Sequence, residues 1–246
     1  MTYIFANWKM YLTHKEGLAL ARKLQTVSIP DDVTLGVFPN MITTAAVKEL
    51  LEDTAIQVGA QNLAWTPAGA YTGAVSAFIA KEIGLSYALV GHSERRYIFA
   101  ETNTVVRKKI EACFDSGITP VVCIGETTKD LEEGNREYRI KKQIMKALEG
   151  LSVKDNQLII AYEPVWAIGT GKQCAPQDVI EMHTLIRKEI KSYTDAEVPL
   201  LYGGSVDAQN VVSYIKLDCV DGVLVGGAST HYDSLISLLG AVQESR

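Results

Sequence analysis

The sequence predicts a single α/β domain over residues 1–246, folded as a closed (β/α)8 barrel with eight parallel strands. Three observations support this fold class: eight short apolar runs recur along the chain, helix-like segments separate them, and polar or glycine-rich residues follow most of the runs. Continuous apolar character is typical of strands buried on both faces of a parallel sheet. Because periodicity does not report closure, a doubly wound open sheet remains the alternative on pattern alone.

Each apolar run has the length and the β-branched content of a buried strand. The runs recur at intervals of about 20 to 40 residues, which suits one βα unit apiece. No low-complexity tract or linker interrupts them. In order, they are YIFANW from Tyr3, TLGVFPN from Thr34, IQVGAQN from Ile56, YALVGH from Tyr87, TPVVCIG from Thr119, QLIIAYEP from Gln157, PLLYGGS from Pro199 and GVLVGG from Gly222.

The segments between the runs carry the signals that start and stop helices. Gly117 ends the segment KKIEACFDSG, as glycine commonly does at a helix C-terminus. Pro176 opens the segment APQDVIEMHTLIRKEIKSY, because proline is tolerated at the first helical position. Ser205 or Asp207 is a candidate N-cap for the segment SVDAQNVVSYI. We therefore expect helices between the strands.

Composition and charge exclude several classes of protein. The formal net charge is −5 and no long basic run is present, which argues against a nucleic-acid or anionic-membrane surface. No apolar stretch approaches the roughly 20 residues of a membrane span, and the N-terminus lacks the pattern of a signal peptide. The cysteines are far apart without a CxxC pair, so neither a disulfide framework nor a zinc site is expected; they are Cys113, Cys123, Cys174 and Cys219. A cytoplasmic protein that acts on small molecules or proteins is predicted.

Chemically useful residues gather at the carboxyl ends of the predicted strands. In a barrel and in an open parallel sheet alike, these ends meet at one crevice, so residues far apart in the sequence would share a site. The residues at these positions are Asn7, Lys9, Gln61, Asn62, His92, Glu126, Glu163, Gly203, Gly204, Ser205, Gly226 and Gly227.

Glu163 is the candidate general base of this site. It follows the apolar and aromatic run LIIAY, so its carboxylate is expected to be partly desolvated. Pro164 restricts the chain after it, and the small residues of 167–171 resemble the tip of a lid that closes over a ligand. An ordinary exposed glutamate at a strand end is the alternative interpretation.

His92 and Lys9 are the candidate electrophile and cation. His92 precedes SERR, which looks like a helix start, and a helix N-terminus disfavours the imidazolium form. A neutral His92 could therefore donate a proton or hydrogen bond, and a purely structural histidine is the alternative interpretation. Lys9 follows the first strand and could equally be a solvated surface lysine. No second ligand lies at metal-binding spacing, so no metal is expected.

Two glycine pairs predict a phosphate seat. Gly203-Gly204 and Gly226-Gly227 each lie between a strand and a candidate helix, and barrels commonly bind phosphate in the loops after their last two strands. GTGK at 169–172 is not a P-loop, because Trp166 and Gln173 stand where that motif requires glycine and serine or threonine. A base, a neutral electrophile, a cation and a phosphate seat together predict proton abstraction beside a carbonyl in a small phosphorylated metabolite.

At this point the sequence resembles the triosephosphate isomerase family over essentially the whole chain. The motifs that carry the resemblance occur in the order of that family and are NWKM at 7–10, GHSERR at 91–96, CIGE at 123–126, AYEPVWAIGTGK at 161–172, LYGGS at 201–205 and GVLVGGAS at 222–229. The resemblance implies a TIM barrel that interconverts dihydroxyacetone phosphate and glyceraldehyde 3-phosphate through an enediolate, without a cofactor.

The resemblance also implies a role for each site residue. Glu163 would move the proton between two carbons, and neutral His92 would shuttle protons among the oxygens. Lys9 and Asn7 would stabilise the developing oxyanion, with Glu94 orienting Lys9. Further contacts would come from the backbone of Gly169, Gly226 and Gly227 and from Ser205 for the phosphate, and from Ile168 and Leu224 as an apolar pair that presses on the base when the lid closes.

A homodimer is expected by the same resemblance. The 65–75 loop presents Trp65, Tyr71 and other apolar residues, and in the family this loop inserts into a neighbouring subunit, where Thr72 would reach the partner's site. The chain departs from the family's usual Asn at Tyr11 and Glu at Ala74, both at or near the expected interface. It departs again at Gln173 and Cys174, behind the lid, where Cys174 is a candidate for oxidation.

Other functions fit the residues less well, with one exception. A paralogue that isomerises a tetrulose phosphate would keep the same catalytic set, so it remains open. A Schiff-base aldolase would need a lysine pointing inward from the sixth strand, where the sequence is LIIAYE. A non-catalytic phosphate-binding protein would not need Glu163, His92 and Lys9 together.

Overall fold

The computed structural model describes residues 1–168 and 173–245. Eight strands close into a barrel in chain order, and each pairs in parallel with its neighbours, including β1 with β8. The strands are β1 (Thr2–Asn7), β2 (Val33–Phe38), β3 (Gln57–Ala60), β4 (Tyr87–Val90), β5 (Thr119–Ile124), β6 (Ile159–Tyr162), β7 (Leu200–Tyr202) and β8 (Gly222–Val225). The predicted (β/α)8 barrel is confirmed, and the open-sheet alternative is wrong.

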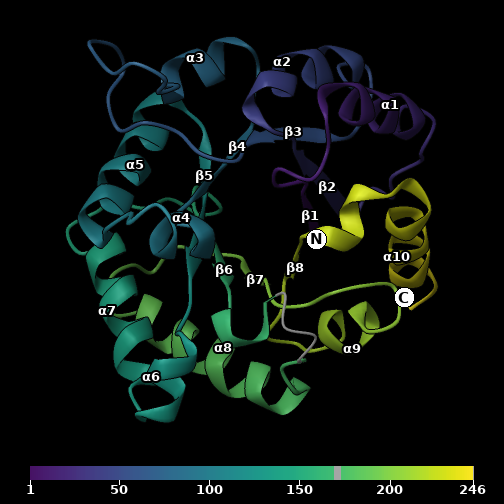
Figure 1. Ribbon diagram of the computed structural model, residues 1–246. Coiled ribbons are helices and arrows are strands. Elements are labelled where there is room, and N and C mark those ends of the chain that lie inside the picture. Colours follow the sequence, from purple (N-terminus) through teal and green to yellow (C-terminus); the bar gives the residue numbers. More distant parts are fainter. Residues whose placement is uncertain (169–172, 246) are drawn as a thin grey trace.

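Helices form a ring outside the barrel (Figure 1). They are α1 (His14–Leu24), α2 (Met41–Leu50), α3 (Ala77–Glu82), α4 (Ser93–Tyr97), α5 (Asn103–Ser116), α6 (Thr128–Glu132), α7 (Arg136–Leu148), α8 (Pro176–Ile190), α9 (Val211–Ile215) and α10 (Tyr232–Glu244), with the 3-10 turns η1 (Val165–Ala167) and η2 (Gly227–Thr230).

Most helix signals in the sequence act as expected, and one does not. Gly117 follows α5 with a left-handed φ of 68°, and Pro176 is the first residue of α8. The segment 205–215 is helical only from Val211. Asp207 accepts hydrogen bonds from the backbone N–H groups of residues 209 and 210, at 2.8 and 3.1 Å, and so forms a turn that delays the helix. The N-cap is Asn210, so neither Ser205 nor Asp207 caps this helix.

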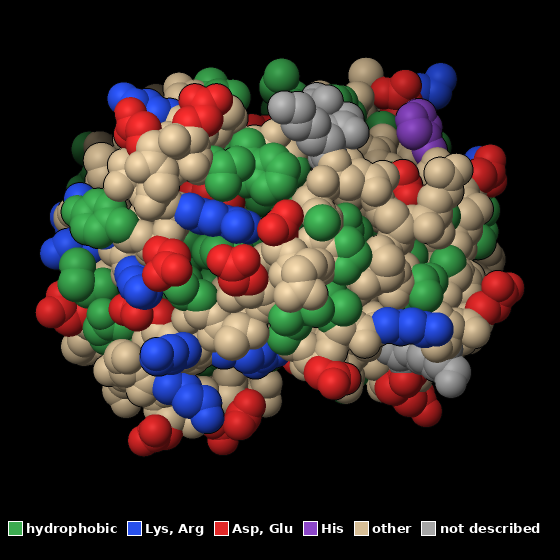
Figure 2. Space-filling view, turned by 90° about the horizontal axis from the view of Figure 1, so that it is seen from below, with side chains coloured by type: hydrophobic (Ala, Val, Ile, Leu, Met, Phe, Trp, Pro, Cys, Tyr) green, Lys and Arg blue, Asp and Glu red, His purple; other side chains and the backbone are tan. Residues whose placement is uncertain are grey.

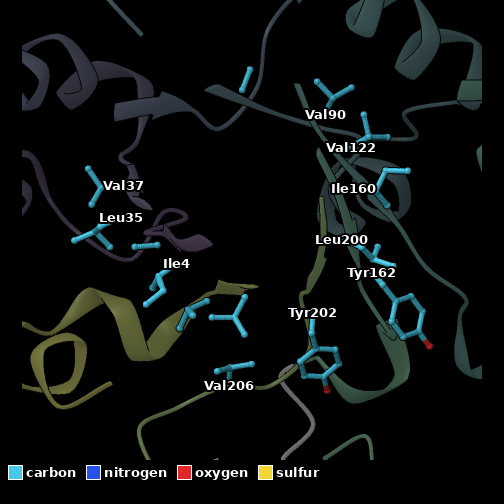
Figure 3. Close-up of a cluster of buried hydrophobic side chains, with 14 of the residues drawn as sticks. Ile4, Leu35, Val37, Val90, Val122, Ile160, Tyr162, Leu200, Tyr202 and Val206 are labelled. Atoms are coloured by element: carbon cyan, nitrogen blue, oxygen red, sulfur yellow. The ribbon is translucent and has the colours of Figure 1, made fainter. Parts of the chain in front are cut away.

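The barrel divides its apolar side chains between two cores. Alternate strand residues face inward, where Phe5, Phe38 and Leu201 belong to a cluster inside the barrel. The residues between them face the helices and form the larger core, in which Figure 3 shows Tyr162 of β6 and Tyr202 of β7 beside the aliphatic residues. This alternation decides which strand residues can reach the barrel mouth.

The surface carries both signs of charge. Figure 2 shows one face on which acidic and basic side chains are interspersed with small groups of hydrophobic ones, so no single sign dominates that face. Within the described part of the chain, no helix combines the length and the apolar character needed to cross a membrane.

His183 provides a pH-dependent element of this fold. It lies fully buried on α8 with Nδ1 3.0 Å from the Cys219 carbonyl oxygen, and its Nε2 finds no partner among the described residues. Burial lowers its pKa to about 4. The folded protein therefore resists a proton that the unfolded chain accepts, and stability falls as the pH drops below about 6.5.

We expect His183→Gln to remove this part of the acid sensitivity. The linked proton costs the folded wild-type protein about 2 kcal/mol at pH 5 relative to pH 8, and nothing above pH 7.5 or so. Urea unfolding of both proteins from pH 8 to pH 5 measures the difference in the pH dependence of the unfolding free energy. His14→Gln, at an exposed histidine, is the control, and parallel pH curves for wild type and His183→Gln would contradict the expectation.

Candidate active site

The inward-facing rows of the barrel lead directly to the site. Ile159 and Ala161 of β6 belong to the inner cluster, so two residues further on Glu163 continues the same row. Phe5 of β1 leads in the same way to Asn7. They open on a cavity of about 290 Å³ at the carboxyl ends of the strands, lined by Asn7, Lys9, Tyr11, His92, Glu163, Ile168, Gly203, Gly204, Ser205, Val206, Asp207, Leu224, Gly226, Gly227 and Ala228.

The cavity brings together nearly all the predicted site residues. Glu94 does not line it but contacts Lys9, which does. Gly169 lies outside the described residues. The remaining nine predicted residues come from the ends of β1, β4, β6, β7 and β8 and from the segments that follow them. Convergence of strand ends, inferred from topology, is therefore found in the structure.

Glu163 and His92 form a buried pair in this cavity. Their side chains are 3% and 7% exposed, and Nε2 of His92 lies 3.1 Å from Oε1 of Glu163. The other carboxylate oxygen accepts a hydrogen bond of 2.8 Å from the backbone N–H of Ser93. The backbone N–H of Glu94 donates to Nδ1 of His92 at 3.2 Å. Because Nδ1 is an acceptor, a neutral His92 carries its proton on Nε2, facing the carboxylate.

Lys9 is held in a demanding conformation by polar contacts. Its φ of 48° is left-handed, which is uncommon for a residue with a side chain. Its N–H donates to Oδ1 of Asn7 at 3.0 Å, and Nε2 of Gln61 donates to its carbonyl at 2.8 Å. Its Nζ donates to Oε1 of Glu94 at 2.7 Å. These contacts direct the cation toward the cavity and fix it there.

The two glycine pairs form one side of the cavity. Gly227 begins the turn η2, directly after β8. A Cβ atom at Gly226 would lie 3.2 Å from Cε of Lys9, so the lysine stem packs against this loop. A Cβ atom at Gly203 would lie 3.0 Å from Cγ of Glu163, a tight contact for a real side chain. The glycines therefore leave room for both the cation and the carboxylate.

The segment after Glu163 is anchored to a buried carboxylate. Oε1 of Glu126 accepts hydrogen bonds from Nε1 of Trp166 at 2.8 Å and from the hydroxyl of Tyr162 at 2.9 Å, and Arg136 lies 3.1 Å away. Burial raises the pKa of Glu126. Sequence analysis placed Glu126 at the crevice but missed this anchoring role, because Trp166 and Arg136 are distant in sequence.

The C-terminal end of the loop that follows Glu163 is buried in the core. Cys174 is fully buried, and burial raises the pKa of its thiol to about 12, both of which disfavour its oxidation. Its carbonyl accepts a hydrogen bond of 2.9 Å from the Tyr214 hydroxyl. Tyr202 stacks on Tyr214 with ring centroids 4.3 Å apart. This end of the loop is fixed by packing.

Two further residues that support the site were missed from the sequence. The backbone of Ser93 binds Glu163, as described above, and only its position after His92 hints at this. Arg96 donates to the carbonyl of Gly91 at 2.6 Å and to that of Cys123 at 3.0 Å, and so ties the ends of β4 and β5 together behind His92. Over residues 1–168 and 173–245, no three His, Cys, Asp or Glu side chains are grouped as metal ligands would be.

Comparison with known proteins agrees with this geometry. The sequence profile described as triosephosphate isomerase matches residues 2–242. The chain belongs to the triosephosphate isomerase family. It is 42% identical to the triosephosphate isomerase of Dictyoglomus thermophilum over 243 residues, which cover 96% of this chain and 97% of the relative. Over 244 residues it is 40% identical to that of Lawsonia intracellularis, with 97% of each chain covered.

A third member of the family gives the same picture. The triosephosphate isomerase of Aquifex aeolicus is 38% identical over 240 residues, which cover 96% of this chain and 97% of the relative. The compared region therefore covers nearly the whole barrel.

We expect His92→Gln to lower kcat for a triose phosphate by a factor of roughly 10² or more, as is typical for loss of an acid–base residue. The reason is the Nε2 proton, which His92 aims at the carboxylate and which glutamine cannot pass on. Steady-state kinetics beside His14→Gln, an exposed histidine, provide the measurement. Wild-type turnover by His92→Gln would make His92 a structural residue.

Proposed function

We propose that this protein is a single-barrel triosephosphate isomerase that interconverts dihydroxyacetone phosphate and glyceraldehyde 3-phosphate. The contact that carries the proposal is the 3.1 Å approach of His92 Nε2 to Glu163 Oε1, in a cavity that also holds Lys9 and two glycine-rich loops. A carboxylate base beside a neutral proton donor matches enolisation of a carbonyl compound. The family relationship supports the same reaction.

In the proposed mechanism, Glu163 removes a proton from the carbon beside the substrate carbonyl. The electron pair of that C–H bond forms the C=C bond of an enediolate, and the carbonyl electrons move to oxygen. Nε2–H of His92 and the cation of Lys9 stabilise this oxygen, and Asn7 supports Lys9. Glu163 returns its proton to the neighbouring carbon, while His92 transfers the proton between the two oxygens.

The substrate would compete for the contact that His92 and Glu163 make with each other in this structure. In the present arrangement Nε2 of His92 faces Glu163, and Ser93 N–H binds the other carboxylate oxygen. A substrate that enters between His92 and Glu163 would receive the hydrogen bond from Nε2 and leave Oε1 free to act as the base. The tautomer fixed by the Glu94 N–H is the one that this exchange requires.

The phosphate would bind on the glycine-lined side of the cavity. We assign it to the backbone N–H groups of Gly226 and Gly227 and to Ser205, with Gly169 as a further donor from the loop. Ile168 and Leu224 line the cavity and would cover the base. Exclusion of water would then protect the reactive enediolate. The cavity, at about 290 Å³, is large enough for a small phosphorylated sugar.

We also propose that the protein is a homodimer through its 65–75 loop. Trp65 and Tyr71 in this loop are 41% and 47% exposed, and their rings contact edge to face. Pro67 and Tyr71 share a small cavity with Ile79 of α3, so the loop and this helix form one apolar surface. Besides Trp65, Tyr71 and Ile79, the large apolar side chains that are exposed among the described residues are Met1, Met10, Tyr11, Ile42, Phe78, Ile83, Tyr97, Ile98, Phe99, Leu131 and Tyr138. Apolar surface of this extent is typical of a contact with another protein.

A cytoplasmic location fits this proposal. All four cysteines are free, as expected in a reducing compartment. No cofactor enters the proposed mechanism, because every proton that moves has a donor and an acceptor among the residues named above.

The deciding experiment compares kcat/KM for dihydroxyacetone phosphate with kcat/KM for a tetrulose phosphate. We expect a triose value approaching the diffusional ceiling of about 10⁸ M⁻¹s⁻¹, which triosephosphate isomerases are known to reach. Glu163→Gln should abolish this turnover but leave binding of inorganic phosphate within about twofold, because the phosphate seat is formed by other strands. Full activity of Glu163→Gln would refute the assignment of the base, and a higher tetrulose value would refute the substrate.

Sedimentation at micromolar concentration tests the dimer. We expect a dimer for the wild-type chain and dissociation of Tyr71→Asp, because the new charge would be buried at the interface. Tyr138→Asp on α7 is the matched control, since Tyr138 is also exposed, at 64%, but lies on a different element. A fully active wild-type monomer would contradict the role of the loop.

A further inference from the structure

Gln143 on α7 makes two hydrogen bonds to the backbone of one residue, Gly125. Its Oε1 accepts from the N–H of Gly125 at 2.8 Å, and its Nε2 donates to the carbonyl of the same residue at 3.1 Å. Both bonds are buried, and Gln143 is 4% exposed. The side-chain amide thus supplies Gly125 with the acceptor and the donor that a neighbouring β-strand would supply. Nothing in the mechanism above uses this contact.

Gly125 needs this partner because it lies just beyond a strand. β5 ends at Ile124, and Gly125 is buried, so its N–H and carbonyl have left the barrel ladder without reaching solvent. Buried backbone groups of this kind are almost always hydrogen-bonded. The Tyr97 hydroxyl also reaches the carbonyl, at 3.4 Å, and this bond is long. Gln143 is therefore the main hydrogen-bond partner of the Gly125 backbone.

The same residue lies directly against the backbone of Glu163. A Cβ atom at position 125 would lie 1.7 Å from the Glu163 carbonyl oxygen, which shows how closely the two chains approach. Hydrogen bonds flank this contact on both sides: Glu163 N–H donates to Ile124 at 2.7 Å, and Val165 N–H donates to Glu126 at 3.1 Å. Residues 124–126 are thus the surface along which the chain carrying the base leaves the barrel.

From this arrangement we propose that Gln143 is a positioning residue for the catalytic base. It holds Gly125 in place, Gly125 holds the backbone of Glu163, and the backbone sets where the carboxylate meets His92 and the substrate. The proposal rests on the function proposed above, in which Glu163 is the base. Displacement of a reacting group by about 1 Å can cost a factor of 10² in rate, so a remote amide can matter to turnover.

A merely structural role would have a different signature. If Gln143 only satisfied buried polar groups, its loss would lower stability and leave kcat per folded molecule unchanged. Gln143 does not line the cavity. Its loss should therefore spare phosphate binding and KM while it lowers kcat, and this split separates positioning of the base from general disorder at the site.

The test uses Gln143→Met, which keeps the length of the side chain and removes both hydrogen bonds. We expect kcat for glyceraldehyde 3-phosphate to fall about 10- to 100-fold, with KM and the affinity for inorganic phosphate within about twofold of wild type. Ile144→Ala, at the next buried residue of α7, is the matched control that destabilises the helix without touching Gly125. Its kcat should be that of the wild type.

A double-mutant cycle with Glu163→Asp asks whether Gln143 acts through the base. Because aspartate already withdraws the carboxylate by one methylene, adding Gln143→Met should cost less than it does in the wild-type background. Strictly multiplicative losses, wild-type kcat in Gln143→Met, or an equal loss in Ile144→Ala would each overturn the proposal.

A second variant at position 143 keeps the proposal testable if Gln143→Met does not fold. Gln143→Leu also removes both hydrogen bonds and introduces no charge, so a similar fall in kcat is expected, and wild-type kcat would overturn the proposal. The wild-type protein separates the two hypotheses. If it does not isomerise triose phosphates, the proposed function fails; if it does and the Gln143 variants match it, only the positioning role fails.

Discussion

The closed parallel barrel imposes one constraint from which the site follows. In every strand alternate residues face inward, and the inner row cannot change face without a shift of register that would expose the whole hydrophobic set. Phe5 and Ala161 lie in these inner rows, and the next members are Asn7 and Glu163. The apolar core thereby aims a polar side chain at the mouth. The same alternation sets both the packing of the core and the placement of these two polar side chains.

Hydrogen-bond donors of the protein take the place of solvent around Glu163. Its side chain is 3% exposed, yet each carboxylate oxygen has a partner, in His92 and in the Ser93 N–H. An ionised group in such a place depends on hydrogen bonds that a protein holds ready in advance. The backbone of α4 supplies two of these constraints, because it also fixes the tautomer of His92. A short helix thus controls both members of the pair.

Much of this could be predicted from the sequence because the informative patterns are local. The run LIIAYE predicts a buried strand with a carboxylate at its end, and the glycine pairs after β7 and β8 predict tight loops. Barrel closure could not be read from periodicity, since an open sheet has the same strands. The support of Gly125 by Gln143 and of Trp166 by Glu126 was also hidden, because these contacts join residues far apart in sequence. At Asp207 the local sequence suggested a helix N-cap, but its side chain instead accepts a hydrogen bond from the backbone N–H of Gln209 and forms a turn before the helix.

The close approach of Gly125 and Gly203 to Glu163 limits which substitutions such a site can accept during evolution. A side chain at position 125 would collide with the backbone of Glu163, and one at position 203 would press on its stem. A substitution of either glycine that would place a charge or hydroxyl beside Glu163 therefore requires the neighbouring atoms to shift, and at position 125 these are backbone atoms. A new polar group beside Glu163 is therefore easier to introduce from positions other than these two glycines.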